Sequence, residues 1–93
     1  MINIEINYGR LVLEGELNIQ TVPNLFKRYP HFAEPVHTID LSKIEKVDSS
    51  GLALLIYWHA KLNETSEFSG FNNCPKHTLA IAKLVGLEAI FDV

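Results

Sequence analysis

Cysteine and long apolar runs are scarce in this sequence, and each shortage excludes a class of protein. The single cysteine, Cys74, has no partner for an internal disulfide, which is typical of proteins from a reducing compartment. The longest apolar run, from Leu52 to Trp58, falls far short of the ~20 residues that a membrane-spanning helix needs. The opening residues MINIEINYGR lack the basic-then-apolar order of a secretory signal peptide. We therefore expect a cytoplasmic protein without a membrane span of its own.

Charge is scarce as well. Charged residues make up 20% of the chain and the net charge is -3, so there is no general attraction for nucleic acid or for anionic lipid. Hydrophobic residues reach 47% of the 93 positions, which is enough for a packed core and too much for a disordered chain. We expect one domain over residues 1–93, without linkers or repeats.

The first half of the chain predicts a β-hairpin followed by a short helix. Apolar and polar residues alternate over positions 2–6 and again over 11–15, around a turn at Asn7–Arg10. The segment 21–29 has helical spacing, with Thr21 as its cap and Pro30 as its stop.

The second half predicts two more strands, at 37–41 and 67–71, and two helices, at 49–64 and 74–87. The ending, residues 88–93, fits neither pattern clearly. The order β-β-α-β-α-β-α indicates an α/β fold, in which helices pack against a mixed sheet of about four strands. Right-handed crossovers make the second, third and fourth strands parallel, while the hairpin adds the first strand antiparallel.

One stretch, VDSSGLALL at positions 47–55, places two hydroxyls between an acid and a glycine at the start of the central helix. Asp48 and Ser49 are residue types that cap helices, because their side-chain oxygens accept hydrogen bonds from free backbone N–H groups. Gly51 would let neighbouring backbone approach closely. The stretch therefore fits a plain helix cap as well as a recognition site.

The central helix carries apolar residues on two faces. One face contains Leu52, Leu55, Ile56, His59 and Leu62 and is expected to meet the sheet. The other contains Leu54, Tyr57, Trp58 and Lys61. Either flanking helices cover this second face, or it is a docking surface, since Trp and Tyr are enriched in interface hot spots.

Few features of the sequence indicate a catalytic function. A serine nucleophile needs a base, and nothing in the sequence ties a histidine to either serine; the Gly-x-Ser-x-Gly elbow is also absent. The four histidines, His31, His37, His59 and His77, and the one cysteine lack metal-ligand spacing, and no phosphate-binding loop is present. We expect no catalytic residue, no metal and no cofactor. We interpret Lys27 and Arg28 as part of a solvent-exposed helix face and not as a lipid-binding site.

The stretch TIDLSKIEKVDSSGLALL resembles the signature of STAS domains. The matching positions are Asp40, Asp48, Ser49, Gly51 and Leu52, and the segments LEGEL and LAIAKLVGL support the likeness over nearly the whole chain. The resemblance implies the same mixed-sheet fold and a protein-binding role. Asp40 and Asp48 are then structural members of the motif.

Two branches of the family imply different partners. The resemblance is greatest to the MlaB-type branch, whose members bind the ATPase subunit of a phospholipid-transport ABC complex containing a membrane permease. That branch implies a location at the cytoplasmic face of the inner membrane, and its important hydroxyl corresponds to Ser49. In the anti-sigma-factor-antagonist branch, a kinase phosphorylates the position of Ser50. The sequence departs from the usual MlaB pattern, in which a threonine and then a small residue follow the aspartate, so the phosphorylation branch stays open. A self-associating structural domain is a third reading.

The expected partner surface is centred on Ser49, Ser50 and Gly51, with Leu54, Tyr57, Trp58 and Lys61 as further contacts from helix geometry. A phosphate on either serine would lie at a helix N-terminus, where free N–H groups and the helix dipole favour negative charge. The modified chain would stay folded, whereas a partner would meet an added charge of about -1.5 to -2.

Overall fold

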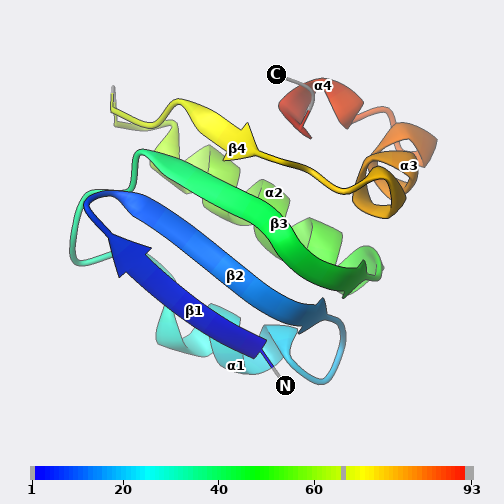
Figure 1. Cartoon of the computed structure of the whole chain (residues 1–93), viewed down its shortest axis with the longest axis horizontal. Helices are drawn as coiled ribbons and strands as arrows, with labels where there is room; N and C mark the ends of the chain where they lie inside the picture. Colours follow the sequence, from blue (N-terminus) through cyan, green and yellow to red (C-terminus); the bar gives the residue numbers. More distant parts are fainter. Residues whose placement is uncertain (1, 66, 92–93) are drawn as a thin grey trace.

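A computed structural model describes residues 2–65 and 67–91 and contains a four-stranded sheet in the order β1-β2-β3-β4 (Figure 1). The elements in chain order are β1 (Ile2–Asn7), β2 (Arg10–Leu17), α1 (Val22–Arg28), β3 (Thr38–Val47), α2 (Ser49–Leu62), β4 (Gly70–Asn72), α3 (Lys76–Leu84) and α4 (Glu88–Phe91). The predicted order of elements is therefore confirmed, with one short helix added at the end.

The β1–β2 hairpin is antiparallel, and its register runs from Ile2↔Gly15 to Asn7↔Arg10. Its two turn residues, Tyr8 and Gly9, have φ angles of 52° and 83°. Positive φ at both positions is the geometry of the tight turns that match the twist of paired strands. The sequence placed this turn correctly, although β2 continues to Leu17 and not only to Gly15.

The strand pairs β2–β3 and β3–β4 are both parallel, as predicted. The expectation that the third strand ends at Leu41 was wrong, because β3 continues to Val47. Its second half still pairs with β2 as far as Leu17↔Val47, after two register shifts that each leave an extra residue in β3, and it buries Ile44 and Val47. The charged residues between those two apolar positions hid this continuation. The fourth strand is shorter than predicted and covers only Gly70–Asn72.

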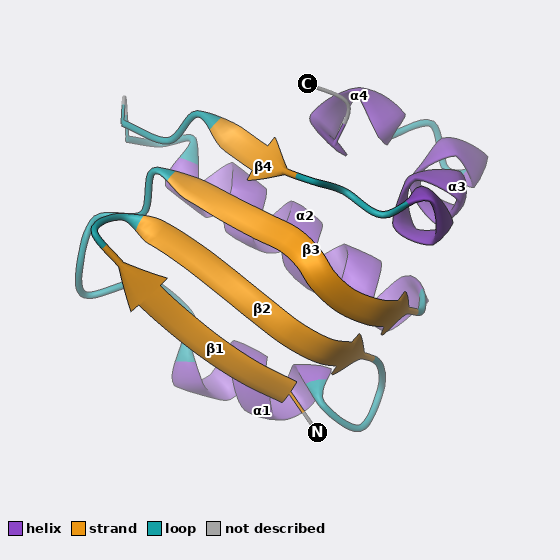
Figure 2. Ribbon diagram, in the orientation of Figure 1, coloured by secondary structure: helices purple, strands orange, loops and turns teal. Residues whose placement is uncertain are grey.

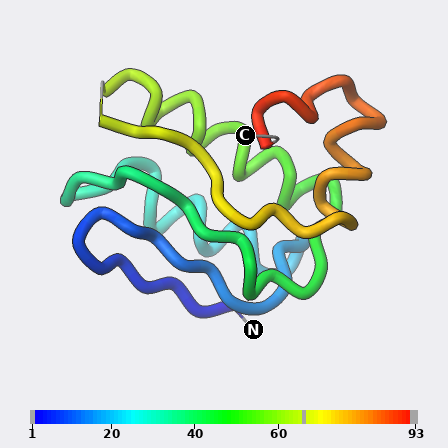
Figure 3. The backbone as a smooth tube through the Cα atoms, turned by 45° about the horizontal axis from the view of Figure 1, so that its top comes forward, coloured from blue at the N-terminus to red at the C-terminus, as the bar shows by residue number. Residues whose placement is uncertain are grey.

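One face of the sheet is covered and the other is open. Helices α1 and α2 lie behind the sheet in Figure 2, and α3 and α4 lie beside β4. The tube in Figure 3 shows the same layering from a second direction. The core between sheet and helices is built from leucines, among them Leu11, Leu13, Leu17, Leu41 and Leu55, all of which are 0% exposed. The open face carries polar side chains that include Asn3, Glu5, Arg10, Glu14 and Lys43.

The predicted ends of the shorter helices need small corrections. Thr21 does precede α1, but its hydroxyl donates to the Glu16 carbonyl 2.8 Å away and makes no cap hydrogen bond to the helix. Helix α3 is shorter than predicted, since it begins after Pro75 and ends at Leu84, with Gly86 at a φ of 74° shortly beyond. The ending that the sequence left open forms α4 up to Phe91, and residues 92–93 lie outside the described part.

Candidate functional site

Asp48 caps α2 and joins it to a neighbouring loop. Its Oδ1 accepts hydrogen bonds from the Gly51 N–H at 3.0 Å and from the Ser50 hydroxyl at 2.6 Å. Its Oδ2 accepts from the backbone N–H of Ile19 at 3.2 Å. The hydrogen bond from Ser50, together with those from the backbone N–H groups, lowers the pKa of Asp48 below its ordinary value. Asp48 is therefore a carboxylate anion at neutral pH that holds both segments.

The start of α2 lies directly against the end of β2. The Asp48 N–H donates to the Leu17 carbonyl at 3.0 Å. A Cβ atom placed on Gly51 would lie 2.6 Å from the Leu17 Cβ and 2.6 Å from its carbonyl oxygen. The neighbour that approaches Gly51 closely, as the sequence predicted, is Leu17. A larger residue at position 51 would force the start of α2 to move.

The two serines differ in what their side chains do. Ser49 is exposed, and its hydroxyl makes no hydrogen bond to the described residues. Ser50 is only partly exposed, and its hydroxyl is held by Asp48. Ser49 is therefore free to donate a hydrogen bond to another molecule, whereas Ser50 would have to release Asp48 before its hydroxyl could donate elsewhere.

No sequence pattern indicated Ile19, which lies in the loop between β2 and α1. Its side chain is 74% exposed, yet its backbone is fixed to Asp48. The rest of the loop is fixed by Asn18, whose Oδ1 accepts from the Gln20 N–H at 2.9 Å and from the Thr21 N–H at 3.1 Å. The contact joins positions 29 apart in the chain, which a local reading of the sequence does not detect.

Three of the predicted docking residues are buried, namely Gly51, Leu54 and Trp58, and this part of the predicted surface was wrong. Leu54 is 3% exposed and Trp58 is 0% exposed. The indole N–H of Trp58 donates to the Tyr29 carbonyl at 3.0 Å, and the Phe32 ring packs edge-on against the indole with centroids 5.3 Å apart. Helix α1 and the segment after it therefore cover this face of α2, which is the alternative that the sequence left open.

The remaining predicted contacts, Tyr57 and Lys61, lie further along α2 than the serines. The Tyr57 hydroxyl donates to the Pro30 carbonyl at 3.1 Å, so this ring also packs toward the covering segment. Lys61 is exposed, but the helical rise places it about 18 Å along α2 from Ser49. It lines a pocket of about 430 Å³ beside residues 31–36, at the far end of the helix. Tyr57 and Lys61 stay predictions as contacts of the partner surface.

The face of α2 that was expected to meet the sheet does so. Leu52, Leu55 and Leu62 are buried, while Ile56 and His59 are partly buried. The His59 ring stacks on Phe71 with centroids 5.7 Å apart, and burial lowers its pKa.

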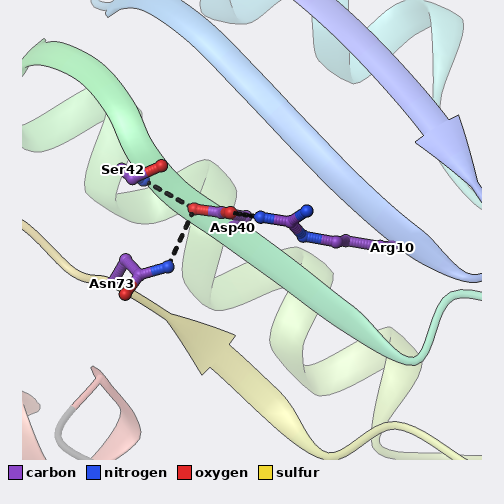
Figure 4. A network of polar contacts seen from close by, with 4 residues as sticks. All are labelled: Arg10, Asp40, Ser42 and Asn73. Carbon is purple, nitrogen blue, oxygen red and sulfur yellow. Dashed lines mark hydrogen bonds and ion pairs between the residues drawn. The ribbon is translucent and has the colours of Figure 1, made fainter.

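Asp40 is a buried carboxylate of the open sheet face (Figure 4). Arg10 forms an ion pair with it, the Ser42 N–H donates to it at 2.8 Å, and the Asn73 amide donates at 3.4 Å. Burial alone would raise the pKa of Asp40, but these hydrogen bonds outweigh it and lower the pKa to about 2. The network ties β2, β3 and the end of β4 together, which is a structural role.

Among the described residues, the Ser50 hydroxyl is paired with the Asp48 carboxylate, and neither serine is paired with a histidine. Within this part of the chain none of the four histidines hydrogen-bonds to Ser49 or Ser50: the His37 ring contacts the Glu67 carbonyl and the His77 ring contacts Thr78. Burial raises the pKa of the Cys74 thiol to about 11, which keeps it protonated.

Over residues 2–65 and 67–91, no cluster of three or more His, Cys, Asp or Glu side chains has metal-binding geometry. In the same part of the chain, no helix has the length and apolar character to cross a membrane.

Comparisons with known proteins agree on one fold. A family model described as "Mlab, STAS domain" matches residues 1–92. Among solved structures, the unphosphorylated form of the anti-sigma factor antagonist SpoIIAA is similar, with a TM-score of 0.73 and 20% sequence identity. The match covers 97% of this chain and 84% of that one, and at this identity it shows the fold alone. A search of curated proteins found no match.

Proposed function

Because this chain belongs to the family of MlaB-type STAS domains, we propose that it is a non-enzymatic binding subunit of a phospholipid-trafficking ABC transporter. Its partner is the ATPase subunit, and it supports the assembly or activity of that subunit. The chain itself needs no cofactor for this role. Its place is then the cytoplasmic face of the inner membrane, reached through the complex.

The observation that carries this proposal is the exposed hydroxyl of Ser49 at the first position of α2. The MlaB-type resemblance assigns the important hydroxyl to this position. The helix start is rigid, because Asp48 caps it and Gly51 lies against β2. A preorganised polar patch loses little conformational freedom when a partner covers it.

The test is binding to the purified ATPase subunit of the same cell. Ser49→Arg places a long cation in the middle of the proposed contact and should weaken binding at least about tenfold, a loss of about 1.4 kcal/mol. The variant should keep its far-UV circular dichroism and its unfolding midpoint, since Ser49 is exposed. Tyr8→Asp is the matched control, because Tyr8 is exposed at the hairpin turn, at the opposite end of β2. Unchanged binding by Ser49→Arg would contradict the proposed site.

A second candidate function is that of an anti-sigma-factor antagonist regulated by phosphorylation of Ser50. The observation in its favour is the hydroxyl at this position, which the usual MlaB pattern lacks and which forms a 2.6 Å hydrogen bond to Asp48. A phosphoryl group there would add about -1.5 to -2 charges beside an ionised carboxylate.

The two candidates differ in the partner that is recovered. A mild-detergent pull-down of the tagged protein from its native cell, followed by mass spectrometry, should retain an ABC ATPase with its permease. Recovery of a small kinase, together with phosphate on Ser50, would favour the second candidate instead.

A further inference from the structure

We infer that the ATPase contact extends from the start of α2 onto the loop after β2, with Ile19 as its apolar anchor and Asp48 as the residue that positions it. This inference rests on the proposed function and adds residues to the same site. The argument starts from the unusual state of Ile19, an exposed apolar side chain on a fixed backbone.

Single exposed apolar residues are common and need no explanation by themselves. Other large apolar side chains of this chain are also exposed, including Tyr8, Leu84 and Val85. What distinguishes Ile19 is that its N–H donates to the carboxylate that caps α2. The same carboxylate accepts the Ser50 hydroxyl through its other oxygen. One side chain therefore fixes the isoleucine and the serine next to each other.

The loop that displays Ile19 is held at both ends. The Asn18 N–H donates to the Thr21 hydroxyl at 3.0 Å, and that hydroxyl donates to the Glu16 carbonyl at 2.8 Å. Beyond Ile19, the Gln20 N–H donates to the Asn18 side chain. A partner that buries Ile19 therefore gains its apolar area without having to order the loop first.

The resulting surface specifies the chemistry of its partner. It offers an isoleucine side chain, the free hydroxyl of Ser49 and the partly covered hydroxyl of Ser50. The first turn of α2 contains no acidic residue, so the Asp48 carboxylate that caps the helix is the negative charge beside these groups. The matching surface is an apolar recess for one aliphatic side chain beside hydrogen-bonding groups. We commit to the ATPase subunit as its owner, because the proposed contact at Ser49 already lies at this place.

The experiment is calorimetric titration of the purified ATPase subunit with five forms of this protein: wild type, Ile19→Asp, Ile19→Ser, Ser49→Arg and Tyr8→Asp. Ile19→Asp removes an interface anchor and should weaken binding at least about tenfold, a loss of about 1.4 kcal/mol or more. Tyr8→Asp replaces another exposed side chain at the far end of β2 and should bind like wild type. Ile19→Ser is a second variant that removes the apolar group without adding charge, and it should also weaken binding.

The role of Asp48 is tested by a double-mutant cycle. Asp48→Asn can no longer accept hydrogen bonds on both oxygens, so it should loosen the hold on Ile19. The loss caused by the uncharged variant Ile19→Ser should then be smaller in the Asp48→Asn background than in wild type. A purely structural cap would give additive losses, and additivity would refute the positioning role.

The remaining outcomes separate this inference from the function beneath it. If Ser49→Arg loses binding while both Ile19 variants bind like wild type, the inference fails and the proposed function stands. If wild type does not bind the ATPase subunit at all, the proposed function fails and the inference fails with it. If Tyr8→Asp loses as much affinity as Ile19→Asp, the effect is not specific to this loop and the inference is overturned.

Discussion

Replacing Gly51 by alanine measures how closely α2 approaches β2. Two effects of opposite sign compete in this variant. Alanine in a helix is favoured over glycine by about 0.5–1 kcal/mol, so an unobstructed Gly51→Ala change would stabilise the protein. The new Cβ, however, would lie 2.6 Å from both the Cβ and the carbonyl oxygen of Leu17, and backbone cannot give way as a flexible side chain does.

Overpacking costs about 1–3 kcal/mol, and a clash with backbone belongs to the upper half of that range, so the net expectation is a loss of about 1–2.5 kcal/mol in the free energy of unfolding. For a domain of this size each kcal/mol lowers the melting temperature by about 4–8 °C. Urea unfolding followed by circular dichroism gives the free energy directly, and calorimetry gives the melting temperature. Because the helix start must shift away from Leu17, binding to the ATPase subunit should weaken as well.

Ser49→Ala is the control for this measurement, since it makes a change of similar size two positions earlier at an exposed site. Its stability should lie within about 0.5 kcal/mol of wild type. The reasoning would be refuted if Gly51→Ala proved as stable as wild type or more stable, because only the helix-propensity effect would then remain.

Two other predictions concern residues outside the docking surface. The pKa of Asp40 is about 2 in the folded chain against an ordinary 3.8, so its stabilising effect is full above about pH 4 and is lost as the pH falls toward 2. Urea titrations at pH 5 and pH 2.5 should therefore show a stability difference between wild type and Asp40→Asn that shrinks in acid; a constant difference would contradict the depressed pKa. Trp58→Phe removes the hydrogen bond to the Tyr29 carbonyl and should lower the free energy of unfolding by about 1–3 kcal/mol. The same variant should bind the ATPase subunit with unchanged affinity, and a loss of binding in a folded Trp58→Phe protein would show that this face of α2 is in use.

The fold was largely predictable because its determinants are local. Alternation at Ile2, Ile4 and Ile6 marks β1, and the apolar run after Asp48 marks α2. The error at β3 arose because the local hydrophobic pattern did not indicate a strand where the pairing with β2 continues. Charged residues separate Ile44 from Val47, although both of these side chains are buried. The strand continues there because β2 offers a partner as far as Leu17, which periodicity alone does not reveal.

The candidate site was predictable only on its α2 side. The residue type of Asp48 predicts a helix cap, and that of Gly51 predicts a close approach at the helix start. Ile19 cannot, because its link to Asp48 appears only when β2 and β3 pair side by side. The error at Trp58 also arose from a contact between distant segments. Helical geometry placed Trp58 on the correct face of α2, but it did not show that α1 and Phe32 cover that face.

The parallel pairing of β2 with β3 also fixes when this surface comes into existence during folding. The β1–β2 hairpin joins neighbouring segments and belongs to the class of structures that form within about 1–10 μs. The contact between Ile19 and Asp48 spans 29 positions and must wait for the crossover through α1 to close, a slower and less local event. A nascent chain that has made only its hairpin therefore presents nothing for a partner to bind. A protein that recognises Ile19 and Ser49 together selects finished molecules, and its binding free energy is added to the folded state alone.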